Sequence, residues 1–279
     1  MNMQDVFKDI EEKAERNAAG KPEHIGADGL LHCDICGHPT QCRVEVFGEQ
    51  RTVRCICKCD QDKLAEEKAQ QERAEKARRI ERLRIEGFAE SEMQRWTFAA
   101  DDQQQPKIRK AMLAYVDGFD DFKRTGKGLL LFGDTSTGKT FAAACVANAL
   151  IDKGVPVLMT NFSQIINRIQ EGFKGRQDYI DSLNGFDLLV IDDLGAERDT
   201  EFMNETVYTI IDSRYRAGLP MIITTNLDAK TMMQEKEISR KRIYSRILER
   251  CHPIEVKGAD RRVRSAISDF AEMNRRLGL

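Results

Sequence analysis

The sequence contains no long apolar segment and no export-like beginning. None of its apolar runs approaches the roughly 20 residues that a helix needs to cross a bilayer. Residues Met1 to Lys13 mix acidic with basic side chains, whereas an export signal needs an apolar core. These absences argue against membrane insertion and export, and we expect a cytoplasmic protein.

The sequence also lacks a net charge large enough to dominate its surface. Its 44 lysines and arginines nearly balance 46 acidic residues, for a formal net charge of −2. No global basic field attracts nucleic acid, so contact with DNA needs a local basic patch. Charged residues make up 32% and hydrophobic residues 41% of the 279 residues, which suits a globular core with a charged surface or a long exposed helix.

Cysteines are concentrated near the beginning of the chain, where six of the eight lie between Cys33 and Cys59. In a chain without an export signal thiols stay reduced, so this cluster indicates metal binding rather than disulfides. A Cys-x₂-Cys pair precedes a Cys-x-Cys-x-Cys run by about twenty residues, which suits a closed, structural Zn²⁺ site with four thiolates. Free thiols and an iron–sulfur cluster are the alternatives. Spacing leaves the choice of four ligands open, with His32, His38 and Cys42 as spare donors.

Three local patterns surround this cluster. Residues 1–20 have the helical spacing of a short amphipathic helix. The runs Arg43 to Phe47 and Arg51 to Arg54 alternate around Gly48 as the arms of a β-hairpin do. Residues 60–86 carry eight acids and eight bases, which predicts a solvated connecting helix. A nucleic-acid-binding arm is disfavoured there, because balanced charges attract phosphate weakly.

The rest of the chain alternates short apolar runs with helical patterns. Strand candidates are Gly128 to Phe132, Val155 to Met159, Leu188 to Ile191, Met221 to Thr225 and Pro253 to Val256. Strands separated by helix-length intervals favour a parallel sheet with crossover helices on both faces. The predicted fold class is α/β, a three-layer sandwich of the P-loop type, preceded by a small cysteine-rich module and a helical linker.

A phosphate-binding motif follows the first of these strands. The motif G-x-x-x-x-G-K-[ST] is matched by Gly133, Asp134, Thr135, Ser136, Thr137, Gly138, Lys139 and Thr140. Glycines let the loop curl its N–H groups around a phosphate, and the helix from Phe141 onward adds its positive end. We expect ATP to bind from Gly133 to Phe141, with Lys139 reaching the β- and γ-phosphates and Thr140 holding Mg²⁺.

Polar side chains end two further strand candidates. Asp192 and Asp193 follow four apolar residues, as in a Walker B element, which predicts that Asp192 holds Mg²⁺ and that Asp193 orients the attacking water. Many ATPases of this class have a glutamate at the second position. Asn226 ends the strand candidate Met221 to Thr225, where it could hydrogen-bond that water or the γ-phosphate as sensor 1.

Ten bases outnumber four acids between Lys236 and Arg264. One arginine of this stretch could enter a neighbouring subunit's site and stabilise charge on the transferred phosphoryl group. The ordinary role of each is a solvated surface charge.

Together, these motifs resemble a known family. The phosphate loop, the run Ile191 to Gly195, the run Thr224 to Asn226 and the run Arg242 to Cys251 are similar to the AAA+ helicase loaders of bacteria and phages, the DnaC/DnaI group. The resemblance covers nearly the whole chain. About 23 residues follow the last strand candidate, too few for a full AAA+ lid, which agrees with the loader group.

The resemblance implies roles for particular residues. Phage and prophage loaders often carry an N-terminal cysteine module, and its pattern matches Cys33, Cys36, Cys57 and Cys59 as zinc ligands. Arg246 matches the arginine finger, and Arg262 matches the sensor 2 position.

The resemblance also implies a function and a division of the chain. A loader binds the hexameric replicative helicase, helps single-stranded DNA enter its ring, and uses ATP hydrolysis for release. We predict an N-terminal helix and zinc module for partner docking (1–60), a charged helical linker (61–92) and an ATPase domain that self-associates (93–279). The alternatives are a transposition helper of the IstB type and a zinc-bearing DNA adaptor whose ATP site is only a switch.

Overall fold

The computed structural model describes residues 21–46, 48–170, 175–196, 200–258, 260, 270 and 273–278. It divides the chain into two compact units, Met1–Ala77 and Arg78–Leu279. The helix predicted for residues 1–20 lies outside the described residues. None of the helices within the described ranges is long and apolar enough to cross a membrane.

The first unit contains two small antiparallel sheets. Strand β1 (Glu23–Ile25) pairs with β2 (Leu31–Cys33), and β3 (Gln41–Val46) pairs with β4 (Glu49–Arg54). The second pair confirms the predicted hairpin. Among the described residues of this unit only Cys33, Thr40 and Cys57 are buried, so it has almost no apolar core. So few buried side chains cannot stabilise a module of this size without a cross-link or a metal.

Helix α2 (Lys58–Gly87) confirms the predicted connecting helix, and the boundary between the units falls within it. Its residues before the boundary are mostly exposed, and Lys63 and Glu67 form an i,i+4 ion pair at 4.0 Å. Its buried residues, Leu83 and Gly87, belong to the second unit. A Cβ on Gly87 would lie 2.6 Å from the Val157 carbonyl oxygen, so glycine allows this close approach.

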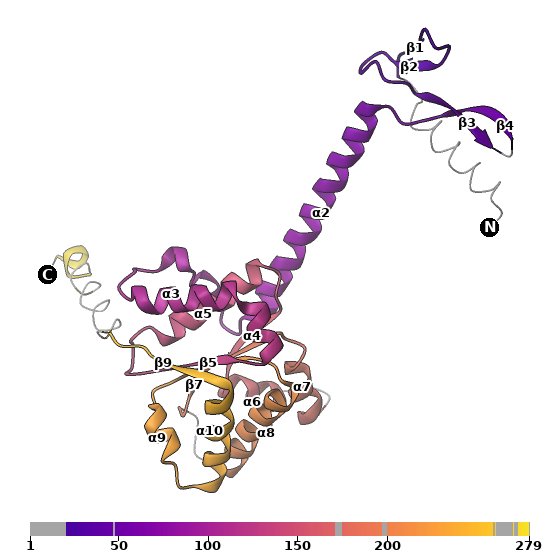
Figure 1. Ribbon diagram of the computed structural model, residues 1–279. Coiled ribbons are helices and arrows are strands. Elements are labelled where there is room, and N and C mark those ends of the chain that lie inside the picture. Colours follow the sequence, from indigo (N-terminus) through magenta and orange to yellow (C-terminus); the bar gives the residue numbers. More distant parts are fainter. Residues whose placement is uncertain are drawn as a thin grey trace. The chain divides into compact units, whose positions relative to one another are not determined.

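The second unit is built on a parallel sheet of five strands in the order β6-β7-β8-β5-β9 (Figure 1). The strands are β5 (Gly128–Phe132), β6 (Val157–Asn161), β7 (Leu188–Leu194), β8 (Met221–Thr225) and β9 (Cys251–Glu255). All five occur where the sequence predicts them, with shifts of a few residues at some ends. This topology confirms the predicted α/β sandwich.

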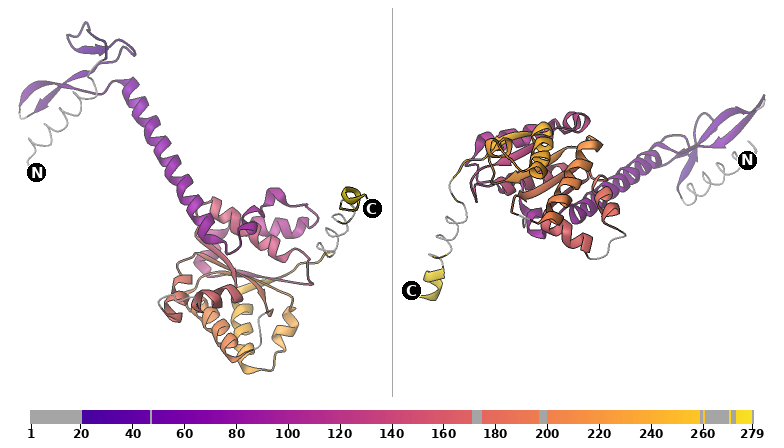
Figure 2. Two further views of the ribbon diagram at one scale, coloured as in Figure 1. Left: turned by 180° about the vertical axis from the view of Figure 1, so that it is seen from behind. Right: turned by 90° about the horizontal axis from the view of Figure 1, so that it is seen from below.

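Helices cover both faces of this sheet (Figure 2). One face packs against α3 (Pro106–Asp117), α4 (Phe119–Thr125) and α5 (Lys139–Asp152), together with the 3₁₀ segments η1 (Ser91–Arg95) and η2 (Phe98–Ala100). The other face packs against α6 (Phe162–Gln170), α7 (Arg176–Leu183), α8 (Glu201–Ala217), α9 (Ala229–Met233) and α10 (Ile238–Arg250). Each face has its own apolar core, and the sheet lies between the two.

A buried arginine holds the amino ends of the central strands. The Arg214 guanidinium is 0% exposed and donates hydrogen bonds to the carbonyl oxygens of Leu183, Phe186, Asp187 and Pro220 at 2.7 to 3.4 Å. Burial lowers the pKa of Arg214 to about 10, so the side chain stays charged at neutral pH. The acceptors lie just before β7 and β8, the strands that carry the acidic and amide side chains at their other ends.

Candidate nucleotide site and cysteine cluster

The phosphate loop follows β5 and leads directly into α5, as the sequence predicts. Gly133 has φ +144, and a Cβ there would lie 2.5 Å from the Val256 carbonyl oxygen. Gly138, at φ +99, is the residue before the first turn of α5. Ser136 also has a positive φ, +62. Both glycines are therefore required by the backbone, which curls the loop around the amino end of α5.

Lys139 lies inside this loop with only 7% of its surface exposed. Its Nζ donates to the carbonyl oxygens of Gly133 at 2.9 Å and Asp134 at 2.6 Å, and to Asn226 Oδ1 at 2.8 Å. Three oxygen acceptors thus hold this ammonium inside the loop. Phosphate oxygens suit this position because they bring negative charge as well as acceptors.

Two predicted magnesium-binding side chains meet at the carboxyl end of β7. Asp192 accepts hydrogen bonds from Thr140 and, at 2.6 Å, from Thr224 Oγ1. Burial raises the pKa of Asp192, and these two hydrogen bonds oppose the shift. A hydroxyl and a carboxylate beside a phosphate loop are the oxygen donors that Mg²⁺ prefers, so the donor set fits this ion.

Asp193 and Asn226 complete the row of polar strand ends. Asp193 has φ +58 and lies in a β-bulge between Ile191 and Leu194, with its N–H donating to Thr224 Oγ1 at 2.8 Å. Asn226 Nδ2 lies 3.5 Å from Asp193 Oδ1, while Asn226 Oδ1 accepts from Lys139. One amide therefore lies between the lysine and the second carboxylate.

Arg246 lies on α10 in a cluster with α8. Its guanidinium pairs with Asp212 at 2.6 Å, donates to Tyr208 Oη at 3.1 Å, and lies 4.8 Å and 5.6 Å from the ring centroids of Tyr208 and Tyr215. These contacts join α8 to α10 within one chain. The structure thus gives Arg246 a packing role in addition to the predicted finger role. Arg262 lies outside the described residues.

Two residues of this region carry no motif and were not predicted. Gln105 Nε2 donates to the Thr137 carbonyl oxygen at 2.7 Å, which ties the segment before α3 to the phosphate loop. Glu90 lies near enough to Asp192 for its charge to contribute to the raised pKa of Asp192. The Phe141 ring packs against Trp96, with centroids 6.2 Å apart. Tertiary packing alone brings Gln105 and Glu90 to this region, and nothing in their local sequence signals it.

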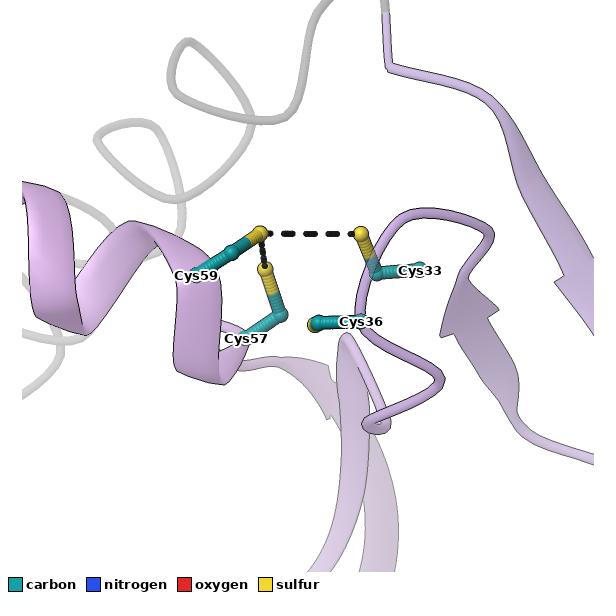
Figure 3. A group of neighbouring side chains, drawn as sticks. All are labelled: Cys33, Cys36, Cys57 and Cys59. Carbon is teal, nitrogen blue, oxygen red and sulfur yellow. Dashed lines mark hydrogen bonds between the residues drawn. The ribbon is translucent and has the colours of Figure 1, made fainter.

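In the first unit, four thiols point toward one another (Figure 3). Cys33 ends β2 and Cys36 lies on the turn that follows, while Cys57 lies just before α2 and Cys59 in its first turn. The four sulfur atoms all lie within 4.8 Å of one another, with Cys33 Sγ to Cys59 Sγ at 3.8 Å and Cys57 Sγ to Cys59 Sγ at 3.1 Å. Sulfurs at about 2.3 Å from one zinc ion in a tetrahedron are about 3.8 Å apart, so the group fits Zn²⁺.

The surroundings of the cluster shift the pKa of its thiols in different directions, and burial raises the pKa of Cys57. Backbone hydrogen bonds from Cys59 and His38 lower the pKa of Cys36 to about 6. Lys21 Nζ lies 3.7 Å from Cys59 Sγ and also pairs with Asp60. An ammonium close to several thiolates offsets their negative charge, a contact for which the sequence gives no signal. The remaining donors, His32, His38, Cys42 and Cys55, are not part of the four-sulfur group.

The parallel sheet, the phosphate loop and the polar ends of β7 and β8 define a P-loop nucleotide-binding protein of the AAA+ class. The family model of the IstB-like ATP binding proteins matches residues 58–268. The chain belongs to this family. The four-cysteine cluster, apart from Cys59, lies before the matched residues.

The curated relatives include a replicative helicase loader and a putative insertion sequence ATP-binding protein. The chain is 26% identical over 181 residues to the replicative helicase loader DnaI of Bacillus subtilis (strain 168), covering 60% of this chain and 58% of the relative. It is 32% identical over 147 residues to a putative insertion sequence ATP-binding protein of Sinorhizobium fredii (strain NBRC 101917 / NGR234), covering 52% of this chain and 49% of the relative. The chain therefore spans about half the length of these relatives.

A solved structure supports the fold. The crystal structure of DnaI superposes with a TM-score of 0.53 at 24% identity, covering 64% of this chain and 99% of that one. The expected resemblance to helicase loaders is confirmed at the level of family and fold.

Proposed function

We propose that this protein is an ATP-dependent loader that binds a hexameric replicative helicase and helps place it on single-stranded DNA, with ATP hydrolysis driving release. The observation that carries the ATPase part is the set of contacts joining Lys139, Asn226 and Asp193, beside Thr140 and Asp192. The likeness to DnaI over 60% of the chain supports the loader part.

The chain's own residues divide the work of phosphoryl transfer. Lys139 exchanges its carbonyl partners for β- and γ-phosphate oxygens, and the loop N–H groups bind the remaining oxygens. Thr140 and Asp192 hold Mg²⁺, which neutralises phosphate charge when bound. Asp193 accepts a hydrogen bond from the attacking water and Asn226 keeps that water in line, because this amide already lies between Asp193 and the lysine.

Hydrolysis on this scheme is completed by a second copy of the chain. Arg246 supplies the finger to the neighbour's γ-phosphate, and Arg262 supplies the sensor 2 contact within its own site. Arg246 is therefore released from Asp212 when copies assemble. Assembly and hydrolysis are coupled through this exchange of partners.

The cysteine module serves partner docking in this proposal. Cys33, Cys36, Cys57 and Cys59 hold Zn²⁺, which folds a unit that has almost no apolar core of its own. We assign residues 1–60 to docking, 61–92 to the linker and 93–279 to the ATPase domain.

A second function, that of an IstB-type transposition helper, is favoured by a different observation. The insertion sequence relative is 32% identical, a higher identity than that of DnaI over a shorter stretch. The two functions share the ATP site and differ in the partner, a helicase in one and a transposase in the other.

The test combines turnover with partner capture by the full chain. Phosphate release is measured for wild type and Lys139→Ala with and without single-stranded DNA, and helicase is recovered on circular single-stranded DNA with and without the protein. We expect ATP turnover that Lys139→Ala abolishes, and helicase loading that depends on the protein. Turnover without helicase loading contradicts the loader, and recovery of a transposase instead favours the helper. Binding of ATP without turnover favours an adaptor switch.

A further inference from the structure

A glutamine side chain holds one peptide group of the phosphate loop from outside the loop. Gln105 is the residue before the first turn of α3, and its Nε2 donates to the Thr137 carbonyl oxygen at 2.7 Å. Thr137 is itself packed into the loop, because its side chain is buried and its Oγ1 donates to the Asp134 carbonyl oxygen at 3.0 Å. The carbonyl that Gln105 contacts therefore belongs to a residue whose side chain is already fixed.

The backbone that carries Gln105 is held by α3. Pro106 occupies the first turn of this helix, and the Arg109 N–H donates to the Gln105 carbonyl oxygen at 3.0 Å. The Arg109 side chain donates to the Phe98 carbonyl oxygen at 2.7 Å and pairs with Asp101 at 3.5 Å, which ties the preceding segment to the same helix. The amide donor thus extends from a fixed backbone to the phosphate loop.

The space for this amide is left by Gly258, which follows β9. A Cβ on Gly258 would lie 2.7 Å from Gln105 Nε2 and 3.7 Å from the Thr137 carbonyl oxygen. An alanine at this position would therefore displace the Gln105 amide while leaving the Thr137 carbonyl in ordinary contact. The glutamine fits between the phosphate loop and the chain after β9.

The held carbonyl determines where the next N–H points. No peptide bond among the described residues is cis, so the Gly138 N–H points away from the Thr137 carbonyl across one planar group. Gly138 has φ +99, and because glycine adopts φ of either sign, this peptide can flip unless something holds it. With the carbonyl turned outward to Gln105, the N–H faces the inner side of the loop, where Lys139 Nζ lies and where this motif binds phosphate.

We propose that Gln105 is a positioning residue for the nucleotide, which holds the Thr137–Gly138 peptide so that the Gly138 N–H donates to a phosphate oxygen. This inference rests on the proposed ATP site. Without the amide, the peptide also adopts the flipped orientation, in which a carbonyl oxygen faces the phosphate oxygens. Loss of a hydrogen bond to a charged group lowers affinity about tenfold or more.

The first test removes the donor and measures affinity. Gln105→Met keeps the length of the side chain without its amide, and Gln104→Met makes the same change at the exposed neighbouring residue. Magnesium with a non-hydrolysable ATP analogue is titrated into each full chain by calorimetry. We expect binding about tenfold weaker in Gln105→Met and unchanged in Gln104→Met. Gly258→Ala, which displaces the amide but keeps the glutamine, should also weaken binding.

The second test reverses the preference of the peptide. In Gln105→Glu the side chain can only accept, so the introduced carboxylate repels the Thr137 carbonyl and attracts the Gly138 N–H outward. Affinity should fall further than in Gln105→Met, by more than the added charge alone costs in the control Gln104→Glu. A merely structural tie between α3 and the loop would give no such order.

Nuclear magnetic resonance can follow this peptide directly. Thr125–Gly126 and Thr137–Gly138 are the only Thr–Gly pairs in the sequence, so ¹³C-carbonyl threonine with ¹⁵N-glycine selects two amide signals. In the nucleotide-free chain, Gln105→Glu should move the Gly138 amide proton downfield of its wild-type position, because it then donates to a carboxylate, while Gly126 stays in place.

Either of two results overturns the inference and leaves the proposed function standing. One is equal nucleotide affinity in Gln105→Met and Gln104→Met. The other is a Gly138 amide proton in Gln105→Glu that does not move downfield. A folded wild type that binds no nucleotide overturns the proposed ATP site together with the inference.

Discussion

Removing the buried guanidinium of Arg214 should destabilise the ATPase unit more than any surface charge change on the same helix. Arg214→Met keeps the apolar stem of the side chain and deletes the donors to four carbonyl oxygens at the amino ends of β7 and β8. Arg216→Met is the matched control, because Arg216 also lies on α8 but its side chain is 74% exposed, and its ion pair is with Asp212 of the same helix, at 2.8 Å.

The expected fall in the free energy of unfolding follows from the carbonyl oxygens that lose their hydrogen-bond donor. Two of the four carbonyls, those of Leu183 and Pro220, also accept backbone N–H groups. Counting only the other two, at about 1–3 kcal/mol for each buried acceptor left without its donor, the free energy of unfolding should fall by about 4 kcal/mol. For a unit of this size that corresponds to a melting temperature about 8–16 °C lower. The exposed pair of Arg216 is worth about 0–1 kcal/mol.

The assay is thermal unfolding of the full chain, followed by calorimetry, with the transition of the ATPase unit identified by its shift on adding nucleotide. Wild type, Arg214→Met and Arg216→Met are compared at the same pH and protein concentration. If Arg214→Met melts within about 2 °C of Arg216→Met, the buried guanidinium does not hold the strand ends and this reasoning is wrong.

Three further predictions concern the proposed sites. Arg246→Ala should lower ATP turnover by about a thousandfold or more while nucleotide binding persists, whereas Arg242→Ala on the same helix should leave turnover nearly unchanged; equal loss of binding in Arg246→Ala would contradict the finger role. Cys36→Ser should abolish stoichiometric zinc binding, measured by metal analysis, and unfold residues 21–57, measured by circular dichroism. The melting transition of the ATPase unit should not move, and the control Cys42→Ser should still bind zinc. Because burial raises the pKa of Asp192, its protonation should weaken binding of the magnesium nucleotide as pH falls, beginning at a higher pH than for an ordinary aspartate; calorimetry from pH 8 to pH 5 that shows constant affinity would refute this.

The strands of the ATPase unit were largely predictable because their signals are local. Gly128 to Phe132 and Met221 to Thr225 coincide with β5 and β8, since continuous apolar residues mark strands buried on both faces. β9 begins at Cys251, before the predicted start at Pro253. Proline is tolerated because β9 is an edge strand, with one side free of partners within the sheet. β7 runs on to Leu194 because a bulge carries the chain past Asp193.

The residues around the site were predictable only where a motif marks them. Lys139, Thr140 and Asp192 belong to motifs whose spacing is dictated by phosphate and magnesium, and the structure brings them together. Gln105 reaches the phosphate loop through tertiary packing, which leaves no pattern in the sequence. In the sequence, Arg214 looks like any charged residue of an amphipathic helix. Its four carbonyl acceptors are visible only in the structure. The family resemblance, not the spacing, selects Cys33, Cys36, Cys57 and Cys59 among the six N-terminal cysteines. The structure places the same four sulfur atoms together.

ATP binding in this protein depends on the buried ammonium of Lys139 and on the loop around it. Calorimetric titration of magnesium with a non-hydrolysable ATP analogue into wild type and Lys139→Ala, both shown to be folded, measures this directly. We predict saturable binding at one site per wild-type chain and a loss of most of that affinity in the variant. Equal affinity in the two proteins, or no heat in the wild type, would contradict the account.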